Sequence, residues 1–170
     1  MKKTDTLTFV RIAMIAAVYT VVSLALAPIS YGNIQVRIAE ALTILPLLYK
    51  PSIYGVTLGC FLTNLLGAFM GVNPTGFIDA IIGTLATFLA AECTYMLKDK
   101  TVKGFPLWSV LMPVIFNFFF VGAELAVLYF EGNVVLGTLI MGGEVAVGEL
   151  ISVILGWLLL KPLGKTNLFK

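Results

Sequence analysis

The chain has 170 residues, of which 59% are hydrophobic and 12% are charged, with a formal net charge of +2 and a mean hydropathy of +1.02. A water-soluble domain of this size cannot bury so much apolar surface, so the composition excludes that class of protein. The sequence contains no histidine, which removes the commonest metal ligand and proton shuttle. The composition therefore predicts an integral membrane protein.

Six apolar stretches, taken in chain order, predict an all-α bundle of six transmembrane helices. A hydrocarbon core of about 30 Å requires about 20 apolar residues per helix. Pro28 and the turn-forming segments 71–76 and 131–133 separate neighbouring stretches. The predicted spans are residues 7–27, 37–51, 53–69, 77–97, 107–130 and 134–160, and the second is short. We expect one membrane domain over residues 1–170, with the first helix retained and not cleaved as a signal peptide.

Basic residues predict the orientation of these spans. With six spans, all Lys and Arg residues except Arg37 fall on one side of the membrane, which the positive-inside rule assigns to the cytoplasm. We therefore expect both termini in the cytoplasm and a multi-pass location in the cell membrane. The residues on the cytoplasmic side are Lys2, Lys3, Arg11, Lys50, Lys98, Lys100, Lys103, Lys161, Lys165 and Lys170.

Acidic side chains inside the predicted spans are the main functional signal. A charge within a bilayer costs several kcal/mol, so each carboxylate requires a partner or a role. Asp79, Glu124 and Glu144 are predicted in the outer halves or middle of their spans, with Asn64 and Asn117 deeper. An acidic cavity favours a cation or a ligand rich in N–H donors. The alternative is that these groups are protonated or hydrogen-bonded between helices as packing contacts.

Four other polar or acidic positions are interpreted separately. Arg37 and Glu40 are three residues apart on one helical face, so they form either a structural ion pair or a ligand contact. A structural role is favoured for Glu92, which lies in the inner half of its span. Glu149 follows Glu144 by five residues and points to a different face, and its role stays open.

The same sequence gives no indication of an enzyme. It has no nucleophile beside a base, no cluster of metal ligands and no basic surface for nucleic acid, so we expect no cofactor and no metal. Cys60 and Cys93 lie in apolar stretches and are interpreted as small buried hydrophobic residues.

Small residues mark one face of the first helix. Ala13 and Ala17 are four residues apart, with Ala16 beside them. Small side chains let another helix approach closely in a membrane. This face suits either packing inside the bundle or docking to another subunit.

The chain resembles the QueT family over essentially its whole length, and three segments carry the resemblance. They are residues 33–43 (NIQVRIAEALT), 59–64 (GCFLTN) and 79–87 (DAIIGTLAT). Members of this family are described as substrate-binding S components of energy-coupling factor (ECF) transporters for queuosine precursors. The resemblance implies capture of the substrate on the outer side, followed by docking on a membrane scaffold subunit that carries two ATPase subunits. It also implies that Ala13, Ala16 and Ala17 form the docking motif on the first helix.

The resemblance further implies a 7-deazaguanine ligand for the acidic cavity. Its guanine-type edge carries two N–H groups, and one carboxylate can accept a hydrogen bond from each of them. The aminomethyl precursor and queuine also carry an amine, which a second carboxylate can bind. We expect two of Asp79, Glu124 and Glu144 to fill these roles. Asn117 or Gln35 is then expected to hydrogen-bond the ring carbonyl. Arg37 and Glu40 are expected either to hold the outer connector closed over the pocket or to contact the ligand. Asn64 completes the expected substrate-binding residues.

Other functions remain open at this point. In one alternative, the chain is an S component whose substrate is another vitamin or a purine-like base. In a second, the chain is a stand-alone transporter or channel coupled to protons or cations. In a third, it is an assembly protein whose buried acids pair with a partner.

Overall fold

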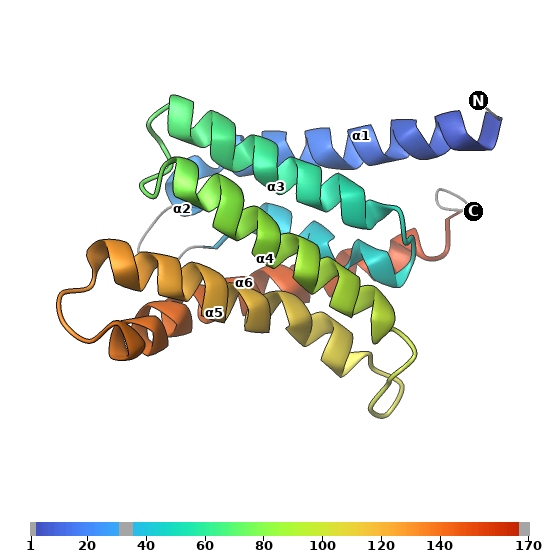
Figure 1. Ribbon diagram of the computed structural model, residues 1–170. Helices are drawn as coiled ribbons and strands as arrows, with labels where there is room; N and C mark the ends of the chain where they lie inside the picture. The colour runs from blue at the N-terminus through green and yellow to red at the C-terminus, as the bar shows by residue number, and fades with distance from the viewer. Residues whose placement is uncertain (1–2, 31–35, 167–170) are drawn as a thin grey trace.

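A computed structural model describes residues 3–30 and 36–166 of the chain. Its elements in chain order are α1 (Lys3–Ala25), α2 (Ala27–Ser30), η1 (Ile38–Leu47), α3 (Ser52–Phe69), α4 (Phe77–Met96), α5 (Leu107–Tyr129) and α6 (Val134–Leu163). Within these residues every element is helical. The five long helices run side by side, and α1 begins at the end of the bundle where α6 finishes (Figure 1).

The long helices α1, α3, α4, α5 and α6 are each long and apolar enough to cross a membrane. Five of the six predicted spans are therefore confirmed as membrane-length helices. The predicted second span, residues 37–51, differs, because it contains the ten-residue 3₁₀ helix η1 and no α-helix of membrane length. At about 2 Å per residue, η1 extends roughly 20 Å and is shorter than the hydrocarbon core. The count of six spans and the side on which the termini lie stay predictions.

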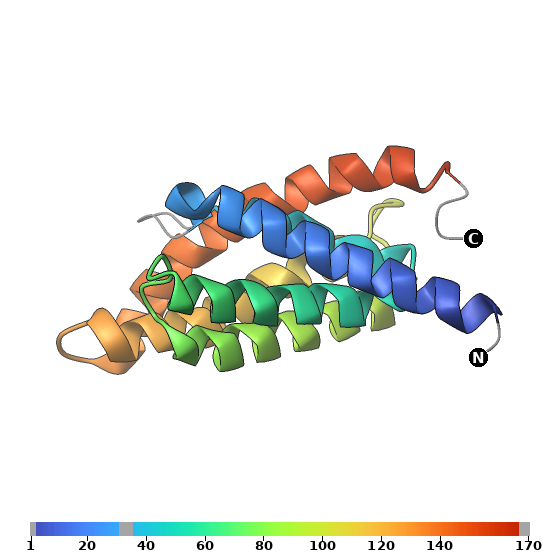
Figure 2. The same cartoon turned by 90° about the horizontal axis from the view of Figure 1, so that it is seen from above.

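The short helix η1 forms the centre of the bundle. It contacts all five long helices, and most of its residues are buried, including Ile44 and Glu40. Pro46 lies inside η1 and cannot donate a backbone hydrogen bond. Seen from above in Figure 2, α6 runs along one side of the bundle and α3 and α4 along the other, while α1 crosses the view diagonally between them. The chain thus places an unusually short polar-containing segment at the middle of its core.

Close contacts between helices depend on glycine, as two of these positions show. A Cβ atom on Gly59 of α3 would lie 2.7 Å from the Cβ of Tyr19 on α1. A Cβ atom on Gly142 of α6 would lie 2.5 Å from the carbonyl oxygen of Phe118 on α5. Larger side chains would push each pair of helices apart. These contacts fix α1 against α3 and α5 against α6.

A proline in α5 leaves one carbonyl group without its helical donor. Pro113 has no N–H for the carbonyl oxygen of Ser109, four residues earlier. The hydroxyl of Thr94 on α4 donates to that oxygen at 3.0 Å. A neighbouring helix therefore satisfies the freed carbonyl, as membrane interiors require.

Candidate functional site: a buried polar cluster at one end of the bundle

The first element of the site is an ion pair between Arg37 and Asp79. Arg37 precedes η1, and Asp79 lies in the first turn of α4, 42 residues later. The Arg37 Nη2 atom is 2.6 Å from the Asp79 Oδ2 atom, and the Asp79 side chain is only 1% exposed. Arg37 thus pairs with an acid on α4, whereas the sequence interpretation paired it with Glu40, three residues away in the chain.

Two asparagines hold Asp79 in position. Asn73, in the loop between α3 and α4, donates from Nδ2 to Asp79 Oδ2 at 3.3 Å. Its Oδ1 atom accepts from both the backbone N–H and the hydroxyl of Thr75, which fixes the loop. Asn64 of α3 donates to the backbone carbonyl of Asp79 at 3.0 Å. Asn64, predicted as a substrate-binding residue, thus contacts the backbone beside Asp79. Asn73 was not predicted, because the segment 71–76 carries only a turn signal.

Glu40 lies at the centre of the same cluster. It is fully buried in η1, and its Oε1 atom accepts a hydrogen bond from the hydroxyl of Tyr19 on α1. The other carboxyl oxygen, Oε2, has no hydrogen-bond partner among the described residues. Glu40 therefore retains an unused acceptor that faces the interior.

Glu149 of α6 completes the cluster from the opposite side. Glu149, Asn117 of α5 and Arg37 line one small cavity of about 10 Å³ together with Val121 and Val145. The Asn117 side chain interacts with the Glu149 carboxyl, and the charges of Arg37 and Glu40 act on it. Within the described part of the chain, its Oε1 atom has no hydrogen-bond partner. Sequence reasoning left Glu149 open, although a buried acid is the same signal that selected its neighbours.

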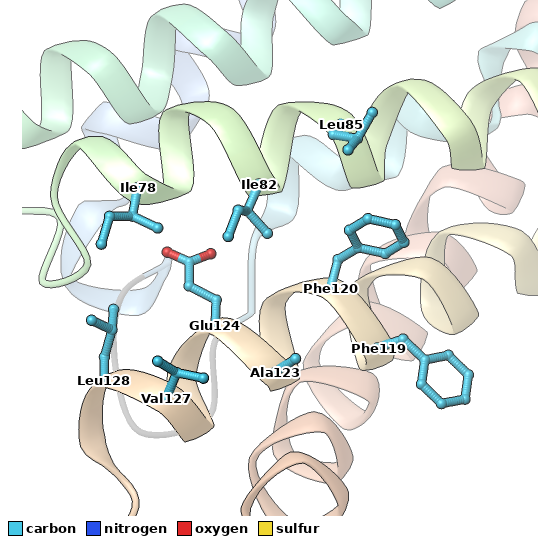
Figure 3. A pocket seen from close by; sticks show the side chains of 9 residues that line it. All are labelled: Ile78, Ile82, Leu85, Phe119, Phe120, Ala123, Glu124, Val127 and Leu128. Carbon is cyan, nitrogen blue, oxygen red and sulfur yellow. The ribbon is translucent and has the colours of Figure 1, made fainter. Parts of the chain in front are cut away.

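Glu124 lies apart from this cavity. It points from α5 into a separate cavity of about 480 Å³ between α4 and α5, toward Ile78 and Ile82 (Figure 3). Neither of its carboxyl oxygens has a hydrogen-bond partner among the residues described here. Glu124 is therefore buried, as expected, but it borders an apolar space.

Two other predicted ligand residues do not join the cluster. Glu144 is exposed on α6, so the structure does not bring it together with Asp79 and Glu124. Gln35 lies outside the described residues. Among the predicted docking residues, Ala13 and Ala17 are exposed on α1, whereas Ala16 is 1% exposed and packs toward Gly59. The predicted small face is thus divided between internal packing and the surface.

The charges in this region do not balance. Four buried carboxyl groups, on Glu40, Asp79, Glu124 and Glu149, accompany the single guanidinium of Arg37. The described residues hold no group of three or more His, Cys, Asp or Glu side chains suited to a metal ion. An excess of acceptors with few donors is suited to a ligand that supplies N–H groups.

Comparisons with known proteins show which family the sequence matches. Residues 9–165 match the model of the family described as QueT transporter. The chain is 31% identical over 171 residues to the queuosine precursor transporter QueT of Lactococcus lactis subsp. cremoris (strain MG1363), with 97% of this chain and 96% of that protein covered. No solved structure matches the chain.

Proposed function

Because the chain belongs to the QueT transporter family, a family of membrane transporters and not of enzymes, we propose that it binds and carries a queuosine precursor. The observation that supports this most strongly is the buried, acid-rich cluster at the end of the bundle away from the lysines. A 7-deazaguanine offers N1–H and an exocyclic amino group on one edge, which complements unpaired carboxyl oxygens. The proposed substrate and the proposed site therefore share the same hydrogen-bond chemistry.

Glu149 is the proposed partner of the guanine-type edge. One carboxylate accepts two parallel N–H groups in a bidentate pair, which is among the stronger hydrogen-bond arrangements in proteins. Its Oε1 atom is unused by the described residues, and the adjacent Asn117 amide can donate to the ring carbonyl. The cavity of about 10 Å³ is closed around these groups. Binding a purine-sized ring therefore requires side chains of the cluster to move apart.

The remaining polar residues are proposed to maintain the site around the ring. Arg37 and Asp79 neutralise one another and lie beside the cavity, and Glu40 is held by Tyr19. Asn64 fixes the first turn of α4, from which Asp79 projects. These contacts hold the first turn of α4 and the start of η1 in position beside the cavity.

The chain is further proposed to act as the S component of an ECF transporter. In this arrangement a membrane scaffold subunit and two ATPase subunits supply the energy for import. The exposed alanines Ala13 and Ala17 of α1 support docking, because small residues let a partner helix approach closely. Ala16 is assigned to internal packing against α3, since its side chain is buried near Gly59.

Uptake of a labelled precursor by cells tests this docking proposal. Cells that express the chain with ECF scaffold and ATPase subunits are expected to accumulate the label, whereas cells with the chain alone are not. Combining Ala13→Leu with Ala17→Leu is expected to abolish uptake but to leave binding by the purified chain unchanged. Ala25→Leu, at another exposed position of α1, is the matched control and is expected to retain uptake.

The opposite pattern would favour the competing function. Uptake by the chain without ECF subunits, dependent on a proton or cation gradient, would identify a stand-alone secondary transporter. Full uptake by the Ala13→Leu, Ala17→Leu variant would remove this face of α1 from the docking surface.

A further inference from the structure

The cavity between α4 and α5 has the size and lining of a ligand site. Its volume is about 480 Å³, within the range of about 300–1,000 Å³ found for small-molecule sites. Nine residues line it, and eight of these are apolar: Ile78, Ile82, Leu85, Phe119, Phe120, Ala123, Val127 and Leu128. Several of them, including Ile78, Leu85, Phe119 and Val127, are exposed on the outside of the bundle. The cavity therefore opens on the face that the membrane covers.

Glu124 is the one polar side chain in this lining. It is 4% exposed, and Figure 3 shows its carboxyl group directed into the space between the two helices. Both of its oxygens lack a hydrogen-bond partner within the described residues. A buried polar group with no partner costs free energy, so a carboxyl group held in this position calls for a donor from outside the chain.

The neighbouring charges do not supply that donor. The groups that act on Glu124 are Asp79, the Thr75 side chain and Arg37. Asp79 and Arg37 form the ion pair described above, and the Thr75 hydroxyl donates to Asn73 Oδ1 at 2.9 Å. A carboxylate within an apolar lining is complemented by a ligand that joins a cationic hydrogen-bond donor to an apolar group. The ring of Phe120, which points toward α4 in Figure 3, offers a face against which that apolar group can pack.

We propose that Glu124 and the α4–α5 cavity bind the ammonium group of an amine that carries an aromatic or aliphatic body and enters from the membrane side. The ammonium donates to the two Glu124 oxygens, and the apolar body fills the space between Ile82 and Phe120. This site is distinct from the cavity at Glu149, and the inference does not rest on the proposed queuosine-precursor function.

Calorimetric titration in lipid nanodiscs tests this site with two probes of matched shape, 2-phenylethylamine and the uncharged 2-phenylethanol. Empty nanodiscs provide the correction for partition into lipid. The amine is expected to bind at least about tenfold more tightly than the alcohol, as a charge-assisted pair in an apolar site implies. Glu124→Gln is expected to remove that difference, and Glu144→Gln, at an exposed carboxyl of α6, to preserve it.

A second variant separates loss of the site from loss of folding. Ala123→Leu is expected to fill the cavity and weaken both probes, while binding at the Glu149 site stays as in the unmodified chain. Equal affinities for amine and alcohol, or an unchanged preference in Glu124→Gln, would overturn the proposal. Precursor binding that persists in that case would leave the proposed function intact.

Competition identifies the source of the amine. Displacement of 2-phenylethylamine by the aminomethyl precursor, but not by the cyano precursor, would show that the arm of the transported substrate occupies the cavity. Persistence of the amine alongside either precursor would show that a separate lipophilic amine binds there. Both outcomes uphold an ammonium site at Glu124.

Discussion

Glu149→Gln is expected to weaken binding of the queuosine precursor by roughly 10- to 100-fold. Hydrogen bonds to a charged group contribute about 1.5–3 kcal/mol, and every 1.4 kcal/mol changes the affinity about tenfold. The amide keeps the shape of the carboxyl group but places an N–H₂ donor against the donor edge of the ring. Calorimetric titration of the purified variant measures this loss directly.

Glu144→Gln provides the matched control for this prediction. Both residues are carboxylates on α6, but Glu144 is exposed whereas Glu149 is 2% exposed. The control variant is expected to bind like the unmodified chain. If Glu144→Gln lost affinity and Glu149→Gln kept it, the sequence-based assignment of Glu144 to the ligand would be correct and the assignment of Glu149 would be wrong.

Arg37→Gln is expected to destabilise the folded chain by about 3–5 kcal/mol, the cost of leaving one partner of a buried ion pair unpaired. Asp79 is 1% exposed, and after the substitution its carboxylate retains only the Asn73 amide at 3.3 Å. Thermal unfolding of the purified protein, followed by circular dichroism, measures the expected fall in Tm.

A double variant distinguishes loss of the ion pair from loss of packing. Adding Asp79→Asn to Arg37→Gln removes the uncompensated charge and is expected to restore part of the stability. Lys103→Gln removes an exposed cation at the opposite end of the bundle and is expected to leave the Tm nearly unchanged. No recovery in the double variant would indicate that Arg37 stabilises the fold through contacts other than Asp79.

The long helices were predictable from the sequence because their signal is strong and local. The predicted spans 53–69, 77–97 and 107–130 differ from α3, α4 and α5 by one residue at most at either end. Apolar runs of membrane length bounded by Gly, Pro and Lys leave few alternatives. The short segment Ile38–Leu47 was harder to predict, since its burial by five helices permits a 3₁₀ geometry that no local pattern specifies.

The sequence predicts which types of residue make up the site, but not which of them pair with one another. Buried acids at one end of the bundle follow from their cost in a membrane, and Asp79, Glu40 and Arg37 are all found there. The Arg37–Asp79 pair joins residues 42 positions apart, which helix periodicity cannot reveal. The choice between Glu144 and Glu149 depends on which face of α6 is turned toward the bundle. Five residues separate these side chains by roughly 140° around the helix axis, so only one of them can face the cluster.

The division of the alanine face also depends on packing that the sequence does not contain. Ala13, Ala16 and Ala17 are equally small, and their spacing alone suits both docking and internal contact. Gly59 lets α3 approach α1 closely on the side of Ala16. Ala13 and Ala17 are left on the exposed side, where a partner subunit has access.

Calorimetric titration of the purified chain with queuine, its aminomethyl and cyano precursors, and guanine tests the central claim most directly. The proposed function predicts tight one-to-one binding of at least one 7-deazaguanine, with guanine weaker. A demonstrably folded sample that binds none of these compounds would contradict the assignment of a queuosine precursor to this chain.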